Sequence, residues 1–147
     1  MRVGIASDHR GVRIKEELVS YLEELGYEIL DFGPAILEST NYPHYAFLVG
    51  EKVASQEVDL GVLICGTGIG MSIAANKVKG VRCAKVDNMR EAVLARSHNN
   101  ANIIALSAEL KIKDLKNLAR LFLEASYTFE DRHNTRIQMI SEYENGN

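Results

Sequence analysis

The sequence has few cysteines and no marker of a secreted or membrane-bound protein. Only two cysteines, Cys65 and Cys83, occur among 147 residues, and no CxxC pair is present. This argues against a disulfide scaffold and against a structural zinc site. No apolar stretch is long enough to cross a bilayer, and no signal peptide precedes the strand-like run that begins near Met1. We therefore expect a cytoplasmic protein that does not associate with membranes.

The chain also lacks an excess of basic residues. It has 17 Lys and Arg residues against 20 Asp and Glu residues, a net charge of −3, which argues against a nucleic-acid partner. Hydrophobic residues make up 46% of the chain and charged residues 25%, the ordinary balance of a globular protein. We expect residues 1–147 to form a single domain with a frayed tail from about residue 144.

Short β-branched segments alternate along the chain with longer amphipathic segments. This alternation predicts an α/β fold in which helices cover both faces of a parallel sheet. The segment 60–65 is apolar without alternation, which is typical of a strand buried on both faces. The expected strands are 3–7, 27–32, 60–65, 81–86 and 102–106. The expected helices are 11–25, 45–55, 89–97, 112–127 and 132–143, and residues 68–78 are expected to form a loop that passes into a helix.

A glycine-rich loop follows the third expected strand, at the strand end where ligands bind in such sheets. It reads Cys65-Gly66-Thr67-Gly68-Ile69-Gly70-Met71-Ser72. Alternate glycines allow a tight turn and a close approach to a ligand, and the N–H groups at a helix start suit an anion. A plain tight turn is the alternative, but three glycines with Thr67 and Ser72 favour the anion site.

The same loop does not complete a nucleotide-binding motif. In a GxGxxG fingerprint the third glycine would fall at Met71, and the fingerprint would follow the first strand rather than the third. No Gly-Lys-Ser/Thr is present, so a P-loop is absent as well. We therefore expect no bound NAD or other nucleotide cofactor.

The two cysteines differ in their predicted positions. Cys65 lies where a strand meets the glycine loop, and a helix N-terminus lowers a thiol pKa from its usual value of about 8.5. A thiolate there can act as base or nucleophile. A buried structural cysteine is the commoner fate, and we predict that fate for Cys83 in the middle of a strand. Position favours a functional role for Cys65.

Other polar residues at element ends have two interpretations each. Asp8 and His9 close the first strand, where Asp8 is either a helix cap or part of an acid–base pair. His98 and Asn99 are ordinary residues for a helix end and a turn. Arg132 and Arg136 are four residues apart, so they share a helix face that suits a phosphate. Spacing alone instead favours a solvated face in which these arginines pair with neighbouring carboxylates.

Taken together, the motifs resemble the type B ribose-5-phosphate isomerase family, which includes galactose-6-phosphate and allose-6-phosphate isomerases. The resemblance spans nearly the whole chain. It rests on segments 7–9, 42–46, 65–70, 72–77 and 96–102, and on Arg132, His133 and Arg136. It implies a Rossmann-like three-layer α/β/α sandwich with a five-stranded parallel sheet. It also implies a homodimer, or a dimer of dimers, with active sites shared between subunits.

The resemblance further implies conversion of ribose 5-phosphate to ribulose 5-phosphate through an enediolate, without a metal. Cys65 would take the proton from C2 and return it to C1. His98 of a partner subunit would assist ring opening, with Asp8 near the ring oxygen. The remaining roles fall to Thr67 beside the reacting groups, the loop residues Gly66, Gly68, Gly70 and Ser72 around the oxyanion, Tyr42 and Asn99 on sugar hydroxyls, and His9, Arg132 and Arg136 on the phosphate.

Four residues depart from the family pattern. Glu109 stands where these enzymes usually carry an arginine that helps to bind phosphate. Glu130 and Asp131 replace a usual Gly-Gly pair, and Asn41 replaces an aspartate. The alternatives are therefore an isomerase of a different sugar phosphate, such as galactose 6-phosphate or allose 6-phosphate, an isomerase of an unphosphorylated sugar, or a non-catalytic sugar-phosphate-binding subunit.

Overall fold

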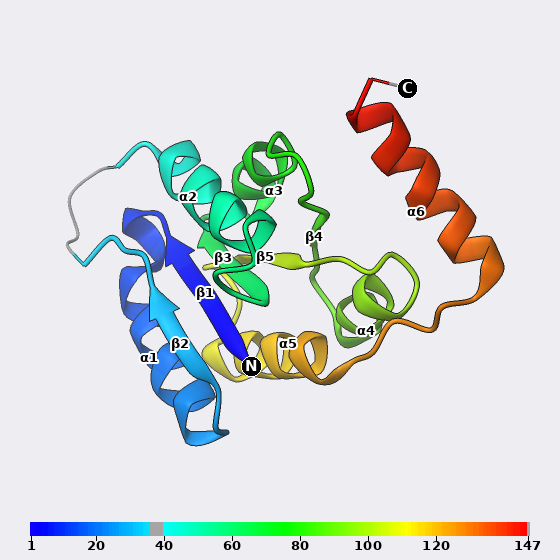
Figure 1. Cartoon of the computed structure of the whole chain (residues 1–147). Helices are drawn as coiled ribbons and strands as arrows, with labels where there is room; N and C mark the ends of the chain where they lie inside the picture. The colour runs from blue at the N-terminus through cyan, green and yellow to red at the C-terminus, as the bar shows by residue number, and fades with distance from the viewer. Residues whose placement is uncertain (36–39, 147) are drawn as a thin grey trace.

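The computed structural model describes residues 1–35 and 40–146, and its centre is a five-stranded parallel sheet (Figure 1). The strand order is β2-β1-β3-β5-β4. The strands are β1 (Arg2–Ser7), β2 (Glu28–Asp31), β3 (Leu60–Cys65), β4 (Cys83–Lys85) and β5 (Ile103–Ser107). The apolar strand β3 is central, as its composition predicts, and Cys65 lies opposite Ser107 at the carboxyl edge of the sheet.

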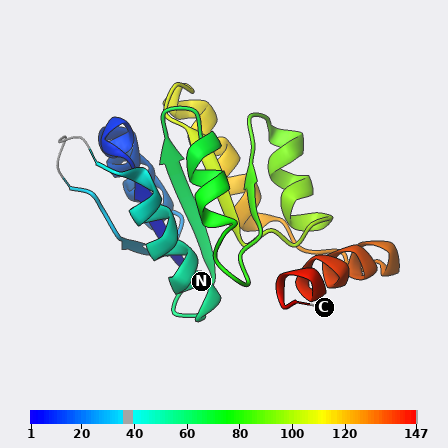
Figure 2. The same ribbon diagram turned by 90° about the horizontal axis from the view of Figure 1, so that it is seen from above.

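Helices cover both faces of this sheet, which confirms the predicted α/β/α sandwich (Figure 2). One face carries α1 (Val12–Glu24), α4 (Met89–Ser97) and α5 (Ile112–Glu124), and the other carries α2 (Tyr42–Ala54) and α3 (Ile69–Ala75). A 3₁₀ turn, η1 (His9–Gly11), joins β1 to α1. The last helix, α6 (Asp131–Glu144), projects away from these layers (Figure 1).

The core consists of two apolar clusters, one on each face of the sheet. Along β3 the side chains alternate between them: Val62 and Ile64 pack with α1, α4 and α5, whereas Leu63 and Cys65 pack with α2 and α3. Fully burying one such aliphatic side chain stabilises the fold by about 1.5–3 kcal/mol. The alternation fixes the direction of Cys65, whose side chain belongs to the α2–α3 face.

Most predicted element boundaries agree with the structure within a few residues, and α2 is the main correction. It begins at Tyr42, whereas the predicted helix begins at residue 45, because a proline such as Pro43 is a common signal of a loop. Proline is tolerated in the first helical turn, where its missing N–H has no intrahelical acceptor. The shift moves Tyr42 from a loop onto the helix.

The expected frayed tail from about residue 144 stays a prediction. Glu144 is the last residue of α6, and the Asn145 N–H closes the helix on the carbonyls of Ser141 and Glu142. Asn147 lies outside the described residues. The single-domain organisation stays a prediction.

Candidate active site

A cleft of about 430 Å³ opens at the carboxyl edge of the sheet, around the end of β3. It brings together residues that follow β1 and β3 with residues from α2 and α3. Six of the predicted site residues line it: Asp8, Tyr42, Cys65, Gly66, Thr67 and Gly70. The full lining is Asp8, Arg10, Tyr42, Cys65, Gly66, Thr67, Ile69, Gly70 and Ile73.

The Cys65 sulfur faces the glycine loop. Its Sγ accepts a hydrogen bond from the Gly68 N–H at 3.1 Å, and the residue is only 5% exposed. Gly68 adopts a left-handed conformation with φ of 83°, which favours glycine over any residue with a side chain. The turn at Gly68 therefore directs a backbone amide at the sulfur.

Two further amides of this loop, those of Thr67 and Gly70, remain available to a ligand, whereas the Ile69 amide does not. The Ile69 N–H donates to Thr67 Oγ1 at 3.2 Å. Within the part of the chain that the structure describes, the N–H groups of Thr67 and Gly70 donate no hydrogen bond. Open backbone donors beside a nucleophilic or basic group are the elements of an oxyanion site.

Asp8 caps the turn that leads into α1. Its Oδ1 accepts from the N–H groups of Arg10 and Gly11 at 2.9 and 3.1 Å. Its Oδ2 lies 3.4 Å from the Gly66 nitrogen and accepts a weak hydrogen bond. The capping interpretation is thus confirmed, and the same carboxylate ties the end of β1 to the glycine loop.

Two side chains hold the loop from its other sides. The buried Ser107 hydroxyl donates to the Gly66 carbonyl at 2.8 Å and accepts from the Glu109 N–H. The Tyr42 ring lies against Gly70, where a built Cβ would approach Tyr42 Cζ to 2.6 Å. Because Gly70 has no side chain, the Tyr42 ring can occupy this space at the cleft wall.

Three predicted site residues lie near the cleft without lining it. His9 is half-buried on η1, where its Nδ1 accepts from the Thr40 N–H at 3.4 Å. Gly68 is buried beneath the loop. The Ser72 side chain lies beside the Cys83 thiol, whose pKa it lowers.

The other four predicted residues lie at the opposite edge of the sheet. His98 and Asn99 follow α4 and precede β5, whose first residue Ile103 pairs with Gly61 at the start of β3. At about 3.3 Å per residue, the four steps from Gly61 to Cys65 span about 13 Å. Arg132 and Arg136 lie on α6, beyond that edge. One chain therefore does not bring these four residues to Cys65.

His98 and His133 form the contact between the end of α4 and α6. Their rings stack with centroids 4.3 Å apart. Burial and the nearby Arg132 cation lower the pKa of His133 from its usual value, which favours the neutral ring at pH 7. Arg132 also pairs with Glu130 at 3.2 Å, the solvated pairing that the spacing favours.

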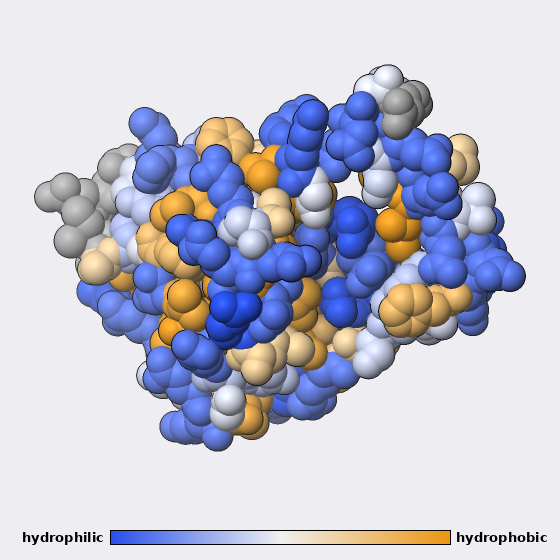
Figure 3. Space-filling model, in the orientation of Figure 1, coloured by the Kyte–Doolittle hydropathy of each residue, from blue (hydrophilic) through white to orange (hydrophobic). Residues whose placement is uncertain are grey.

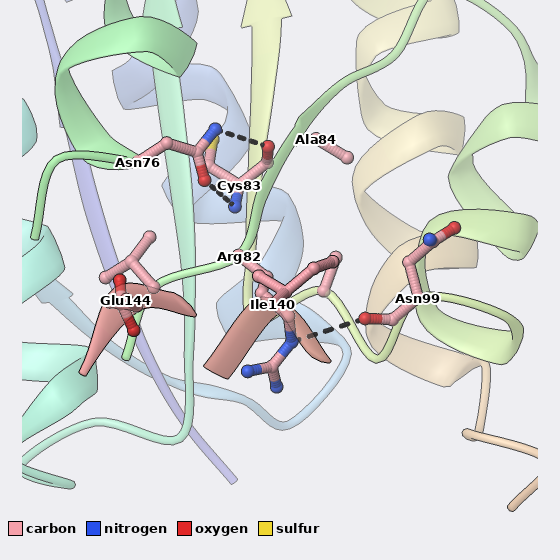
Figure 4. A pocket seen from close by; sticks show the side chains of 9 residues that line it. Asn76, Arg82, Cys83, Ala84, Asn99, Ile140 and Glu144 are labelled. Atoms are coloured by element: carbon pink, nitrogen blue, oxygen red, sulfur yellow. Dashed lines mark hydrogen bonds between the residues drawn. The ribbon is translucent and has the colours of Figure 1, made fainter. Parts of the chain in front are cut away.

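A second cavity, of about 480 Å³, lies between β4 and α6 (Figure 4). Asn99, Arg82, Cys83 and Ile140 are among its lining residues, and the Asn99 carbonyl accepts from Arg82 Nε at 3.3 Å. Burial raises the pKa of the Cys83 thiol to about 12, so this thiol stays protonated at neutral pH. The predicted structural role of Cys83 agrees with this environment.

Sequence patterns did not identify Arg10 as a cleft residue, although it directly follows Asp8 and His9 at a strand end. In residues 1–35 and 40–146, no three His, Cys, Asp or Glu side chains are close enough together to hold a metal ion. No described helix has the length and apolar composition to span a bilayer. The cytoplasmic location stays a prediction.

Comparison with known proteins places this chain in one family. A family model described as ribose/galactose isomerase matches residues 3–140. The ribose-5-phosphate isomerase B of Escherichia coli is 40% identical, with 97% of this chain and 96% of that protein covered.

Solved structures agree in both fold and family. The ribose-5-phosphate isomerase B of Clostridium thermocellum is similar at a TM-score of 0.96 and 42% identity, with 99% of each chain covered. The enzyme of Mycoplasma genitalium with bound ribulose-5-phosphate is similar at a TM-score of 0.95 and 40% identity, with 99% of this chain and 97% of that chain covered. This chain therefore belongs to the ribose/galactose isomerase family, and within it to the type B ribose-5-phosphate isomerases.

Proposed function

We propose that this sugar-phosphate aldose–ketose isomerase interconverts ribose 5-phosphate and ribulose 5-phosphate, with Cys65 as the base. The observation that carries the proposal is the Cys65 sulfur at the cleft, 3.1 Å from the Gly68 nitrogen and beside two open amides. Its relative from Mycoplasma genitalium, whose structure holds ribulose-5-phosphate, supports the choice of a five-carbon sugar.

Moving a proton between adjacent carbons requires one base and a pocket that stabilises negative charge. The Cys65 thiolate takes the proton from C2 of the open-chain aldose, which leaves an enediolate, and the resulting thiol returns a proton to C1. The N–H groups of Thr67 and Gly70 donate to the developing oxyanion. Losing one such donor typically raises a barrier by about 3–4 kcal/mol.

The remaining cleft residues orient the sugar and open its ring. Asp8 lies at the cleft floor, where its carboxylate is placed to accept a sugar hydroxyl proton or hydrogen bond. The Thr67 hydroxyl and the Tyr42 phenol are exposed at the cleft wall and bind hydroxyl groups. His9, on the adjacent turn, contributes to the phosphate subsite.

We further propose that the enzyme is a homodimer in which each active site contains residues of both subunits. His98, Asn99, Arg132 and Arg136 lie about 13 Å or more from Cys65 along the strand direction, so they reach a cleft only from a second copy. In that copy His98 assists ring opening, Asn99 contacts a sugar hydroxyl, and the two arginines bind phosphate.

Apolar surface on α6 and α3 supports this assembly. Met139, Ile140 and Tyr143 on α6 are 62%, 53% and 85% exposed, and Ile69 and Ile73 on α3 beside the cleft are 52% and 59% exposed. Figure 3 shows α6 separated by a hollow from the body of the chain. Large exposed apolar side chains on one helix are typical of a surface that a partner covers.

A panel of aldose phosphates tests the substrate. Wild-type enzyme is assayed with ribose 5-phosphate, allose 6-phosphate, galactose 6-phosphate and unphosphorylated ribose. We expect the highest kcat/KM with ribose 5-phosphate, and a value for ribose at least about a hundredfold lower because the phosphate supplies orienting binding energy. A higher kcat/KM with a six-carbon phosphate would overturn the five-carbon assignment, and turnover of none of them would overturn the catalytic function.

A further inference from the structure

The Arg10 side chain crosses the carboxyl edge of the sheet over the glycine loop. Arg10 follows β1, Gly66 follows β3 and Glu109 follows β5, and these three strands are neighbours in that order. A Cβ built at Gly66 would collide with the Arg10 guanidinium. The Arg10 NH2 nitrogen lies 3.8 Å from Glu109 Oε1. The guanidinium thus lies over the residue next to Cys65 and points towards Glu109.

Arg10 gives the cleft its positive charge. Among the residues of 1–35 and 40–146 that line the cleft, it is the only cationic one. The other charged lining residue is Asp8, whose carboxylate accepts hydrogen bonds from the amides of Arg10, Gly11 and Gly66. An anionic ligand that enters the cleft therefore meets a full positive charge at Arg10.

The ion pair with Glu109 is weak enough for a ligand to replace it. Both side chains are mostly exposed, at 57% and 65%, and their closest atoms are 3.8 Å apart. Exposed pairs with this geometry contribute little to stability. A phosphate monoester carries a charge of about −1.5 to −2, and its oxygens match the donor fork of a guanidinium. A phosphate therefore competes well against the single carboxylate of Glu109.

We propose that Arg10 binds the phosphate group of the sugar-phosphate substrate, and that Glu109 holds the Arg10 guanidinium over the cleft when substrate is absent. The inference rests on the proposed function, because it assigns the phosphate subsite of the same cleft. Arg10 comes from the subunit that supplies Cys65, so it fixes the distance between the phosphate and the reacting carbons within one chain.

Arg10→Gln is the main test, with Arg13→Gln as its matched control. Arg13 is an exposed arginine at the start of α1 and does not line the cleft. Steady-state kinetics with ribose 5-phosphate are combined with competitive inhibition by inorganic phosphate. For Arg10→Gln we expect the KM and the inhibition constant of phosphate to rise about tenfold or more, with kcat changed by less than about threefold. Arg13→Gln leaves all three constants unchanged.

Two results would overturn the assignment. Unchanged KM and inhibition constant in Arg10→Gln would show that Arg10 does not bind phosphate. A fall in kcat with both of these constants unchanged would place Arg10 at the reacting carbons instead. Glu109→Gln gives a further check: removing the competing carboxylate should lower KM about threefold, and should have no effect in the Arg10→Gln background.

Binding of inorganic phosphate to the Cys65→Ala variant separates this inference from the proposed function. Calorimetry measures the dissociation constant without turnover. If Cys65 is not the base, or ribose 5-phosphate is not the substrate, adding Arg10→Gln to Cys65→Ala should still weaken phosphate binding about tenfold. Equal affinities in the two variants would overturn the role of Arg10 and leave the isomerase proposal intact.

Discussion

The two edges of the same sheet hold their polar residues in different ways. At the carboxyl edge, the Gly66 amide donates to the Asp8 carboxylate and the Gly68 amide donates to the Cys65 sulfur, all within one chain. At the amino edge, His98 stacks on His133, and the arginines lie on a helix that projects from the fold. The first arrangement is a preorganised site. In the second, the polar residues lie at a helix end and on a projecting helix, a placement that suits the proposed action in another subunit.

The two cysteines offer the largest expected contrast between these edges. Cys83 lines the cavity between β4 and α6. Its thiol has a pKa of about 12, so about one molecule in ten thousand is a thiolate at pH 8. We expect iodoacetamide at pH 8 to alkylate Cys65 and to react with Cys83 about a thousandfold more slowly than with a free thiol. Mass spectrometry of digested peptides gives both rates.

The control for alkylation is the Cys65→Ser variant. It should remain unlabelled in its folded state and take up one label after unfolding in urea. Rapid labelling of Cys83 in the folded variant would show that its thiol is not protected. The expected difference in reactivity between Cys65 and Cys83 would then be contradicted.

Complementation tests whether the two edges meet across a subunit interface. Cys65→Ala and His98→Ala should each lose about a hundredfold or more in kcat. Refolded as an equal mixture, half of the dimers are hybrids with one intact site, so the activity should recover to roughly a quarter of wild type. The measurement is kcat with ribose 5-phosphate before and after joint refolding.

A same-edge pair is the matched control for complementation. A mixture of Cys65→Ala and Thr67→Ala places both defects in the cleft of the same edge, so no hybrid has an intact site and the activity should not recover. Absence of recovery with Cys65→Ala and His98→Ala as well would contradict the shared site.

A smaller effect is expected from the glycine that accommodates Tyr42. Gly70→Ala places a Cβ within 2.6 Å of Tyr42 Cζ, which displaces the ring from the cleft wall. We expect kcat/KM to fall about tenfold through loss of substrate positioning, with little change in the free energy of unfolding because alanine favours a helix.

Gly26→Ala serves as the control, because it should lower the free energy of unfolding without changing kcat/KM. Its φ of 98° is strained for alanine, and nothing lies within 4 Å of the built Cβ. We expect a loss of about 1–2 kcal/mol in the free energy of unfolding with kcat/KM unchanged. Normal kcat/KM in Gly70→Ala would show that Tyr42 does not need its present position.

The layered fold and the position of Cys65 could be predicted because they depend on local patterns. The unbroken apolar run of β3 identifies a central strand, and the glycines that follow it identify the loop at the ligand-binding edge. The start of α2 could not be predicted from the apolar pattern, because Pro43 favours loops and first helical turns alike. Ser72 could not be placed either, because the rotation of α3 directs it to Cys83 rather than to the cleft.

The proposed division of the site between two edges was also beyond the sequence patterns. Periodicity locates His98 at a helix end, but it does not tell which copy of the chain that end faces. Arg10 was missed for a different reason: an exposed arginine in a turn has the sequence context of a solvated residue. Only the positions of Gly66 and Glu109 around it show that its guanidinium lies over the cleft.

The proton transfer itself is measured most directly with ribose 5-phosphate that carries deuterium at C2. Proton NMR follows the loss of this deuterium in wild type, Cys83→Ala and Cys65→Ala. If the Cys65 sulfur is the base, wild type and Cys83→Ala should remove the deuterium at similar rates, and Cys65→Ala about a hundredfold or more slowly. Removal by Cys65→Ala at the wild-type rate would contradict the account.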